Sequence, residues 1–447
     1  MSRREDALRY FEQEDSYIRQ RMDSGIELYR KGDATIRFCT ENGEPLPENI
    51  VVEAKQRSHE FKFGANIFML DEFPSQEENA VYREKFAELF NLATVPFYWA
   101  DLEPEEGKTR YAADSPKIYR RPAPDLCLAY CREKGIEPKC HCLNYDTVSP
   151  AWFLNQPVSY CKEKLLQRFQ EIADRYSKEI PSFEVTNETL GEGDTKFFYE
   201  DDFVEWSFRM ADRIFPNNRL IINDFKYWQP NISTNRNLYY MQVERLLRAG
   251  YRVDSVGFQY HCYHGRREKI LEKSLAEEAT DAARRYNPRV LYQMMDNFAK
   301  LGIPQQITEM SIPSYTLERE DELIQAELTK HLYRCFFSHP AMEAVIYWNL
   351  VDGYAASAPA GDMTRGENWF RAGFLRHDLS EKPVFLELKK LIHEEWQTEL
   401  TVRAVDGTAR FRGFYGDYDL TVYANGKQIP VKISLSKSSK NQFTVTL

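Results

Sequence analysis

Two glutamates, Glu188 and Glu309, each stand at or near the end of a short apolar run. Glu188 directly follows Ser182–Asn187, and Glu309 lies near the end of Gln306–Met310. Two carboxyl groups on opposite sides of a glycosidic bond can hydrolyse it, and retention of configuration places them about 5–5.5 Å apart. Either glutamate alone is typical of an ion-paired loop residue, so the hypothesis rests on the pair.

The ends of the other apolar runs also carry polar or aromatic side chains. In a barrel of parallel strands these ends meet at one face, where active sites form. The residues at these positions are Asn66, Trp99, His141, Asn187, Asn223, Asp224, Gln259, His261 and Trp348. A random core would not place amide, imidazole and indole groups this way, so we expect them to surround the two glutamates.

A metal site is a weaker interpretation. Cys140 and Cys142 flank His141, but residues i and i+2 of a strand point to one face and residue i+1 to the other. One ion could not reach all three side chains, so buried free thiols are the better reading. Carboxylate chemistry uses only water, and the sequence therefore predicts no cofactor and no metal.

The elements that must position these residues alternate between short apolar runs and longer helical patterns. The predicted strands are 61–66, 92–97, 138–143, 182–187, 220–224, 255–260, 306–310 and 344–349, and the clearest predicted helices are 159–178, 203–214, 237–249 and 321–337. Eight such units predict an α/β fold, a (β/α)₈ TIM barrel. A doubly wound sheet would bring a glycine-rich phosphate turn after an early strand, and none occurs.

Both ends of the chain differ from this pattern. Residues 6–30 read as one amphipathic helix, and the strands 34–39 and 50–54 around a turn at 41–44 read as a hairpin. Five short alternating strands follow residue 395 and make too thin a sheet to stand alone. We therefore expect an accessory β-sandwich in which the N-terminal hairpin completes the C-terminal strands. The predicted division is 1–60, 61–395 and 396–447.

The composition excludes some partners. The 59 basic and 69 acidic residues give a net charge of −10, which argues against nucleic acid because a phosphate backbone requires a basic surface. No apolar stretch has the length of a membrane span. The charged opening residues predict a cytoplasmic protein, unless a leader has been removed upstream.

Several motifs carry a family resemblance. Phe183-Glu-Val-Thr-Asn-Glu188 resembles the Trp-Asp-Val-Val-Asn-Glu acid/base motif of glycoside hydrolase family 10, best known for endo-β-1,4-xylanases. Gln306-Ile-Thr-Glu309-Met resembles its Ile-Thr-Glu-Leu-Asp nucleophile motif. The segments starting at His141 and Gly257, and Tyr347-Trp348 with Asp352, are also similar. The motifs keep their order between residues 61 and 391, and Trp99 keeps the spacing of the second strand.

The resemblance implies a role for each matching residue. Glu188 would be the acid/base, which needs a raised pKa, and Glu309 the nucleophile, oriented by His261. Asn187 would bind the sugar 2-hydroxyl, a contact that strengthens in the transition state. His141 and Gln259 would complete the −1 sugar site, and Trp348 would stack on that sugar.

The departures from the family pattern concern sugar recognition. The second strand of the xylanases carries Glu, Asn and Lys, which grip the −2 and −1 sugars, where this chain has Thr94, Val95 and Tyr98. Tyr145 and Asp146 replace a Trp-His pair, and Ser311 replaces the Asp that steadies the histidine. A site that loses its hydroxyl-binding partners discriminates against the old substrate.

The sequence therefore predicts a retaining β-glycoside hydrolase, xylanase-like, with altered −1 and −2 sites. Its expected partner is an oligosaccharide, polysaccharide or glycoside. Two alternatives stay open. One is the same mechanism on a β-glycoside outside xylan, and the other is a carbohydrate-binding barrel that has lost catalysis.

Overall fold

The computed structural model describes residues 3–13, 15–41, 46–225, 236–263 and 282–447. Its centre is a closed barrel of parallel strands in the order β10-β3-β4-β5-β6-β7-β8-β9. The strands are β3 Lys62–Asn66, β4 Leu92–Pro96, β5 Glu137–His141, β6 Ser182–Asn187, β7 Arg219–Asp224, β8 Ser255–Phe258, β9 Gln305–Met310 and β10 Met342–Tyr347. The predicted (β/α)₈ barrel is confirmed, and every predicted barrel strand falls on an observed one.

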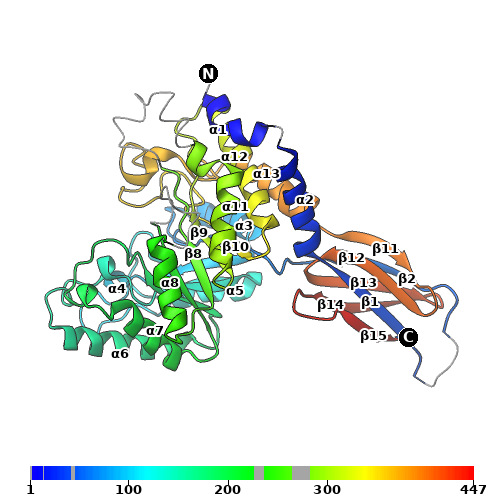
Figure 1. Cartoon of the computed structure of the whole chain (residues 1–447), viewed down its shortest axis with the longest axis horizontal. Helices are drawn as coiled ribbons and strands as arrows, with labels where there is room; N and C mark the ends of the chain where they lie inside the picture. Colours follow the sequence, from blue (N-terminus) through cyan, green and yellow to red (C-terminus); the bar gives the residue numbers. More distant parts are fainter. Residues whose placement is uncertain (1–2, 14, 42–45, 226–235, 264–281) are drawn as a thin grey trace.

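Helices surround the barrel (Figure 1). They are α3 Gln76–Leu89, α4 Trp99–Leu102, α5 Pro124–Lys134, α6 Val158–Tyr176, α7 Phe203–Ile214, α8 Leu238–Arg248, α11 Pro288–Ala299, α12 Arg319–Ser338 and α13 Pro383–Lys390. Their apolar side chains recur at helical spacing and face the strands, as Leu165, Phe169 and Ile172 of α6 do. This packing forms the main core and holds the strand ends in place.

The N-terminal segment forms two helices, so the prediction of one continuous helix was wrong. They are α1 Arg3–Glu12 and α2 Ser16–Arg30. Asp15 begins α2 as its N-cap, because its carboxylate accepts from the backbone N–H of Ile18 at 3.2 Å. Both helices contact α12 and add Leu8, Met22 and Ile26 to the barrel core. The predicted division at residue 60 stays a prediction, but the two helices pack on the barrel.

The accessory β-sandwich lies beside the barrel (Figure 1). One sheet has the order β12-β1-β15 and the other β11-β2-β13-β14. Their strands are β1 Lys31–Cys39, β2 Val51–Gln56, β11 Glu399–Arg403, β12 Thr408–Phe414, β13 Gly416–Ala424, β14 Lys427–Leu435 and β15 Gln442–Thr446. Blue N-terminal strands lie among orange and red C-terminal ones, so both chain ends build the sandwich, as predicted.

The two N-terminal strands do not form a hairpin, which corrects the prediction. β1 pairs with β12 and β15, whereas β2 pairs with β11 and β13. Both strands alternate buried and partly exposed residues. Each lines one inner face of the sandwich, and this requires one strand in each layer. Most of the predicted turn, at residues 42–45, lies outside the described residues.

An aromatic and hydrogen-bonded joint connects the two bodies. Trp396 stacks on Phe337 of α12 with ring centroids 4.0 Å apart. The buried guanidinium of Arg30, where α2 meets β1, donates to the carbonyls of Phe337, His339 and Met342. The sandwich is therefore fixed to the face of the barrel opposite the carboxyl ends of its strands.

Candidate active site

Glu309 lies near the carboxyl end of β9 and is almost fully buried. The side-chain amide of Asn223, on β7, donates to Glu309 Oε1 at 2.8 Å. The Nε2 atom of His261, which follows β8, lies 3.1 Å from the other carboxylate oxygen. Two neighbouring strands therefore fix both oxygens of this carboxylate in place.

Glu188 follows β6 and has a left-handed backbone with φ of 55°, a conformation that a non-glycine residue rarely adopts. The hydroxyl of Tyr145 donates to Glu188 Oε2 at 2.7 Å. The amide of Gln259 donates to the other oxygen at 2.9 Å. This carboxylate is also held by two donors, which come from the segments after β5 and β8.

An amide network joins the two glutamates. Asn223 Nδ2, which donates to Glu309, also donates to Asn187 Oδ1 at 2.8 Å. Gln259 Nε2, which donates to Glu188, lies 3.2 Å from the same Asn187 oxygen. Because this oxygen accepts from both amides, the Asn187 NH₂ group must point its protons elsewhere. No described residue accepts from it, which leaves it available for a ligand.

His261 forms a short relay behind Glu309. Its Nδ1 lies 3.0 Å from Ser311 Oγ, which also accepts from the hydroxyl of Tyr263 at 3.1 Å. Burial alone would lower the pKa of His261, but its hydrogen bond to Glu309 and the charge of that residue raise it. A raised pKa favours the imidazolium, which donates from both ring nitrogens.

A buried charge cluster fixes His141, at the end of β5. Its Nδ1 contacts Glu184 on β6, which also pairs with Lys139. Burial alone would raise the pKa of Glu184, but Lys139 and His141 lower it to about 2. Burial would lower the pKa of His141, and the charge and hydrogen bond of Glu184 raise it instead. The Nε2 atom of His141 lies 3.2 Å from the Tyr98 hydroxyl.

An aromatic cluster lies against both histidines. Phe68 contacts Tyr98 and Trp348 edge to face, at 5.7 and 5.1 Å between ring centroids. Trp348 also meets His141 at 5.5 Å and His261 at 6.1 Å. The structure therefore brings Tyr98 and Trp348, both predicted site residues, together with the two histidines.

Three predicted site residues do not join this cluster or the amide network. Trp99 packs against Trp152 and Phe153 in the barrel core, and its indole N–H donates to Glu103 at 2.7 Å. Asp146 accepts from the backbone N–H groups of Asp194 and Thr195. It thereby organises the loop after β6 and pairs with neither Arg120 nor Arg121. Asn66 is buried at the end of β3, and its Nδ2 has no partner among the described residues.

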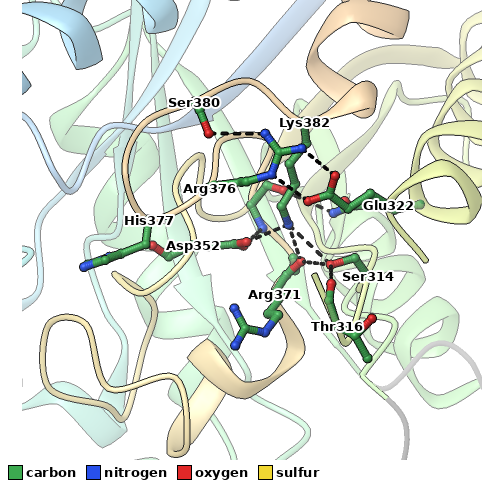
Figure 2. A network of polar contacts seen from close by, with 12 residues as sticks. Ser314, Thr316, Glu322, Asp352, Arg371, Arg376, His377, Ser380 and Lys382 are labelled. Atoms are coloured by element: carbon green, nitrogen blue, oxygen red, sulfur yellow. Dashed lines mark hydrogen bonds and ion pairs between the residues drawn. The ribbon is translucent and has the colours of Figure 1, made fainter. Parts of the chain in front are cut away.

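A buried ion pair fixes the long loop after β10 (Figure 2). Lys382 Nζ lies 2.7 Å from Asp352 Oδ2 and donates to the carbonyl of Arg371 at 2.8 Å. The other oxygen of Asp352 accepts from the Gly373 N–H at 2.7 Å. The loop carries Asn349, directly after Trp348, so these contacts hold one wall of the site.

Sequence reasoning gave no specific role to two residues of the site. Asn223 was expected near the two glutamates only as a strand end, yet it contacts both Asn187 and Glu309. Glu184 was passed over inside an apolar strand. Lys139 and His141, two residues apart on β5 and facing the same way, were the signal that a buried carboxylate lies opposite.

No group of three or more potential metal ligands occurs among the described residues. Within the same part of the chain, no helix is both long and apolar enough to cross a membrane.

The chain has several relatives. It is 25% identical over 408 residues to the anti-sigma-I factor RsgI6 of Acetivibrio thermocellus, covering 90% of this chain and 46% of that protein. It is 24% identical over 347 residues to endo-1,4-beta-xylanase C of Paenibacillus barcinonensis, covering 69% and 29%. The chain therefore spans less than half the length of these curated relatives.

The fold and the family agree. The solved structure of xylanase 10B from Thermotoga petrophila in complex with xylobiose matches with a TM-score of 0.57 at 19% identity, covering 75% of this chain and 95% of that one. At this identity the match shows the fold alone. Residues 70–359, well over half of the chain, match the family model described as Glycosyl hydrolase family 10. The chain belongs to glycosyl hydrolase family 10.

Proposed function

We propose that this protein is a retaining β-glycoside hydrolase that acts on a xylan-like glycan. The observation that carries the proposal is the amide network, in which Asn223 and Gln259 connect Glu309 to Glu188 through one oxygen of Asn187. This arrangement directs two carboxyl groups and one free amide NH₂ toward a common place. A xylan-like substrate is favoured by the xylanases among the relatives.

In the proposed reaction, Glu309 attacks the anomeric carbon while Glu188 protonates the leaving oxygen. A covalent glycosyl–enzyme ester forms and the glycosidic C–O bond breaks. Glu188 then takes a proton from water, which hydrolyses the ester and restores Glu309. Since His261 donates to Glu309 Oε2, it orients this carboxylate so that the other oxygen can attack.

Sugar binding in the proposal falls to three kinds of contact. The NH₂ group of Asn187 would donate to a hydroxyl of the reacting sugar. Trp348, at the border of the aromatic cluster, would pack against the sugar ring, because indole faces suit the apolar C–H surfaces of sugars. Tyr98 and His141, joined by their 3.2 Å contact, would meet the hydroxyls on the glycone side. The indole of Trp99 packs in the barrel core, so Trp99 is not part of the proposed sugar site.

We further propose that glycone recognition differs from that of a xylanase. Thr94 occupies a position that carries a charged or amide group in those enzymes, and its buried hydroxyl has no partner among the described residues. Tyr98, where those enzymes carry a lysine, is buried, and its hydroxyl lies 3.2 Å from Nε2 of His141. Plain xylan is therefore expected to be a poorer substrate than one matched to this wall.

The test is hydrolysis of aryl β-glycosides and of xylan by the wild type, Glu309→Ala and Glu188→Ala. Loss of either carboxyl group should lower kcat at least about 1,000-fold, because nucleophile and acid/base act as a unit. Azide should restore turnover by giving an α-glycosyl azide with Glu309→Ala and a β-glycosyl azide with Glu188→Ala. Glu137→Gln, at the opposite end of β5, is the matched control and should be unchanged.

Two results would contradict the proposal. Full activity in Glu309→Ala would exclude the nucleophile role, and an α-configured first product from the wild type would exclude retention. The relative RsgI6, which aligns with 90% of this chain, is named for regulation and not for hydrolysis. It favours a barrel without hydrolysis, so carbohydrate binding without turnover is the second candidate, which predicts saccharide binding with no activity on any member of the panel.

A further inference from the structure

Two consecutive arginines reach the aromatic cluster from the loop between β4 and α5. The guanidinium of Arg121 lies 4.0 Å above the ring of Tyr98 and 5.3 Å from that of Phe68. The guanidinium of Arg120 lies 5.6 Å from the ring of Phe68. Since Tyr98 contacts His141 and Phe68 contacts Trp348, both cations lie at the wall of the proposed sugar site.

Arg120 is buried, and in the described part of the chain it has no anionic partner. Its side chain is part of a residue only 5% exposed, and its Nη2 donates to the neutral amide of Asn349 at 2.8 Å. Its Nε has no hydrogen-bond partner, and no carboxylate of the described residues lies within ion-pair distance. Buried charges in proteins are normally paired, so this guanidinium has unused capacity for an anion.

Arg121 does not supply the negative charge that Arg120 lacks. Its Nε pairs with Asp101 at 2.8 Å, and its Nη1 donates to the backbone carbonyl of Arg120 at 2.9 Å. Burial lowers the pKa of Arg120, and the like charge of Arg121 lowers it further. The charge of Glu367 raises the pKa of Arg120, but the two residues are connected only through Asn349, which accepts from Arg120 and donates to Glu367. An anion bound beside Arg120 and Arg121 would offset both the cost of burial and the repulsion between the two cations.

Two adjacent cations, Arg120 and Arg121, are unusual in a site of this charge. The chain has a net charge of −10, and the proposed nucleophile Glu309 places a negative charge in the site. An anionic substrate would be repelled from such a site unless cations stood at its point of entry. A guanidinium has the planar, forked donors that match a carboxylate in two hydrogen bonds.

We infer that Arg120 and Arg121 bind the carboxylate of a uronic acid unit carried by the substrate, beside Trp348 on the β4 side of the site. The inference rests on the proposed function for the nature of the glycan. The two guanidinium groups replace the lost polar grips of the second strand and make the enzyme selective for acidic over neutral β-glycans.

The test measures binding and does not depend on turnover. Calorimetry on Glu309→Ala compares neutral xylo-oligosaccharides with the same oligosaccharides bearing a glucuronosyl branch, and with oligosaccharides that have a uronic acid in the main chain. At least one acidic ligand should bind about 10-fold more tightly or better, because hydrogen bonds to charged groups are strong. The advantage should shrink as salt is raised. The tighter acidic ligand identifies branch or chain as the source of the carboxylate.

Arg121→Gln, added to Glu309→Ala, should remove most of this preference, because the charged contact to the carboxylate is lost. The affinity of the same variant for the neutral oligosaccharides gives the baseline for this comparison. Arg121→Lys, which keeps the charge and loses the fork, should retain part of the preference. The matched control is Arg175→Gln, because Arg175 also lies over a tyrosine ring, 5.2 Å from Tyr111, and pairs with Asp125 at 2.8 Å, on the outer helices. It should change nothing. Arg120→Gln is measured as well where it folds.

Equal affinity for acidic and neutral ligands, or no binding of either, would overturn the inference. A preference for acidic ligands that survives Arg121→Gln and Arg120→Gln would also overturn it. The proposed function fails separately, through an active Glu309→Ala enzyme or an inverted product. Acidic preference in binding without hydrolysis would sustain this inference and contradict only the catalytic role.

Discussion

At the scale of single residues, Ser311 determines the charge around His261, which hydrogen-bonds to the proposed nucleophile Glu309. The family pattern places an aspartate there, and this chain has the buried Ser311, 3.0 Å from His261 Nδ1. A serine orients the ring but adds no negative charge. The pKa of His261 is therefore raised chiefly by Glu309, and the imidazolium is less stable than it would be between two carboxylates.

Ser311→Asp should raise the pKa of His261 by about 1 unit or more, because an opposite charge at hydrogen-bond distance favours the charged form. The measurement is a titration of the His261 ring protons by NMR. Ser311→Asn is the matched control, since it has the same shape without the charge and should leave the pKa where it is. An unchanged pKa in Ser311→Asp would show that Nδ1 does not face this side chain.

Residue types at strand ends predicted part of this site. Glu188, Glu309, His261, Asn187 and Gln259 do come together, because a parallel barrel gathers its carboxyl ends at one face. The sequence could not tell which amide faces which carboxylate, so the central place of Asn223 was not foreseen. It also could not separate Tyr98 from Trp99, since one residue past a strand end is enough to turn a side chain from the site into the core.

At the scale of elements, the loop after β10 depends on one buried ion pair. Lys382 and Asp352 are both almost inaccessible. Burial raises the pKa of Asp352 and lowers that of Lys382, and their mutual attraction does not fully offset this. Such a pair costs free energy to bury, yet losing one member is worse because the other charge remains.

Lys382→Met should lower the free energy of unfolding by about 3–5 kcal/mol, and Lys382→Met with Asp352→Asn should lose clearly less than the sum of the single changes. The side-chain oxygen that remains after Asp352→Asn can still accept from the Gly373 N–H, so the loop keeps that contact. Urea unfolding provides the measurement. The exposed pair Lys108 and Glu105 is the control, and Lys108→Met should cost almost nothing. Additive losses at the buried pair would argue against coupling.

Local sequence patterns predicted the strands and helices of the barrel but not the pairing of the N-terminal strands. The alternation of apolar runs and helices predicted the barrel because each unit buries its own face. The hairpin prediction failed because a turn signal reports chain reversal and not strand pairing. β1 and β2 found better partners far away in sequence, as in the pairing of Ala54 with Leu400. The break between α1 and α2 depends on the cap at Asp15, which a helical pattern alone conceals.

At the scale of the whole molecule, we propose that barrel and sandwich unfold as one unit through their joint. His59 lies at its centre, with the rings of Phe63, Phe337 and Phe414 around it. Its Nδ1 lies 3.2 Å from the amide nitrogen of Gln56 and its Nε2 lies 3.3 Å from the carbonyl of Ile392. This pattern fits a neutral ring that accepts at Nδ1 and donates at Nε2.

Burial lowers the pKa of His59 to about 4, against an ordinary value of 6.5. Between these two pH values the unfolded chain binds a proton that the folded chain does not. The free energy of unfolding should therefore fall as the pH drops from 6.5 to 4, by about 3 kcal/mol from this residue, and change no further below pH 4. A proton added at Nδ1 of His59 would face the NH₂ group of Gln56, which is also a donor. This hydrogen bond would be lost, and the joint would open.

Chemical unfolding of the wild type and His59→Gln at pH 7 and pH 4.5 tests this, with the fluorescence of Trp396 and the other tryptophans as the signal. His59→Gln should be less stable at pH 7 and lose less on acidification, because it has no ring to protonate. His331 is the matched control, since burial also lowers its pKa to about 4 but it packs against Phe11, away from the joint. Acid should split the wild-type transition by opening the joint. His331→Gln should reduce the acid loss but split in the same way, because it keeps His59, whereas His59→Gln should keep one transition. Parallel pH dependence in the wild type and His59→Gln would remove His59 from this role.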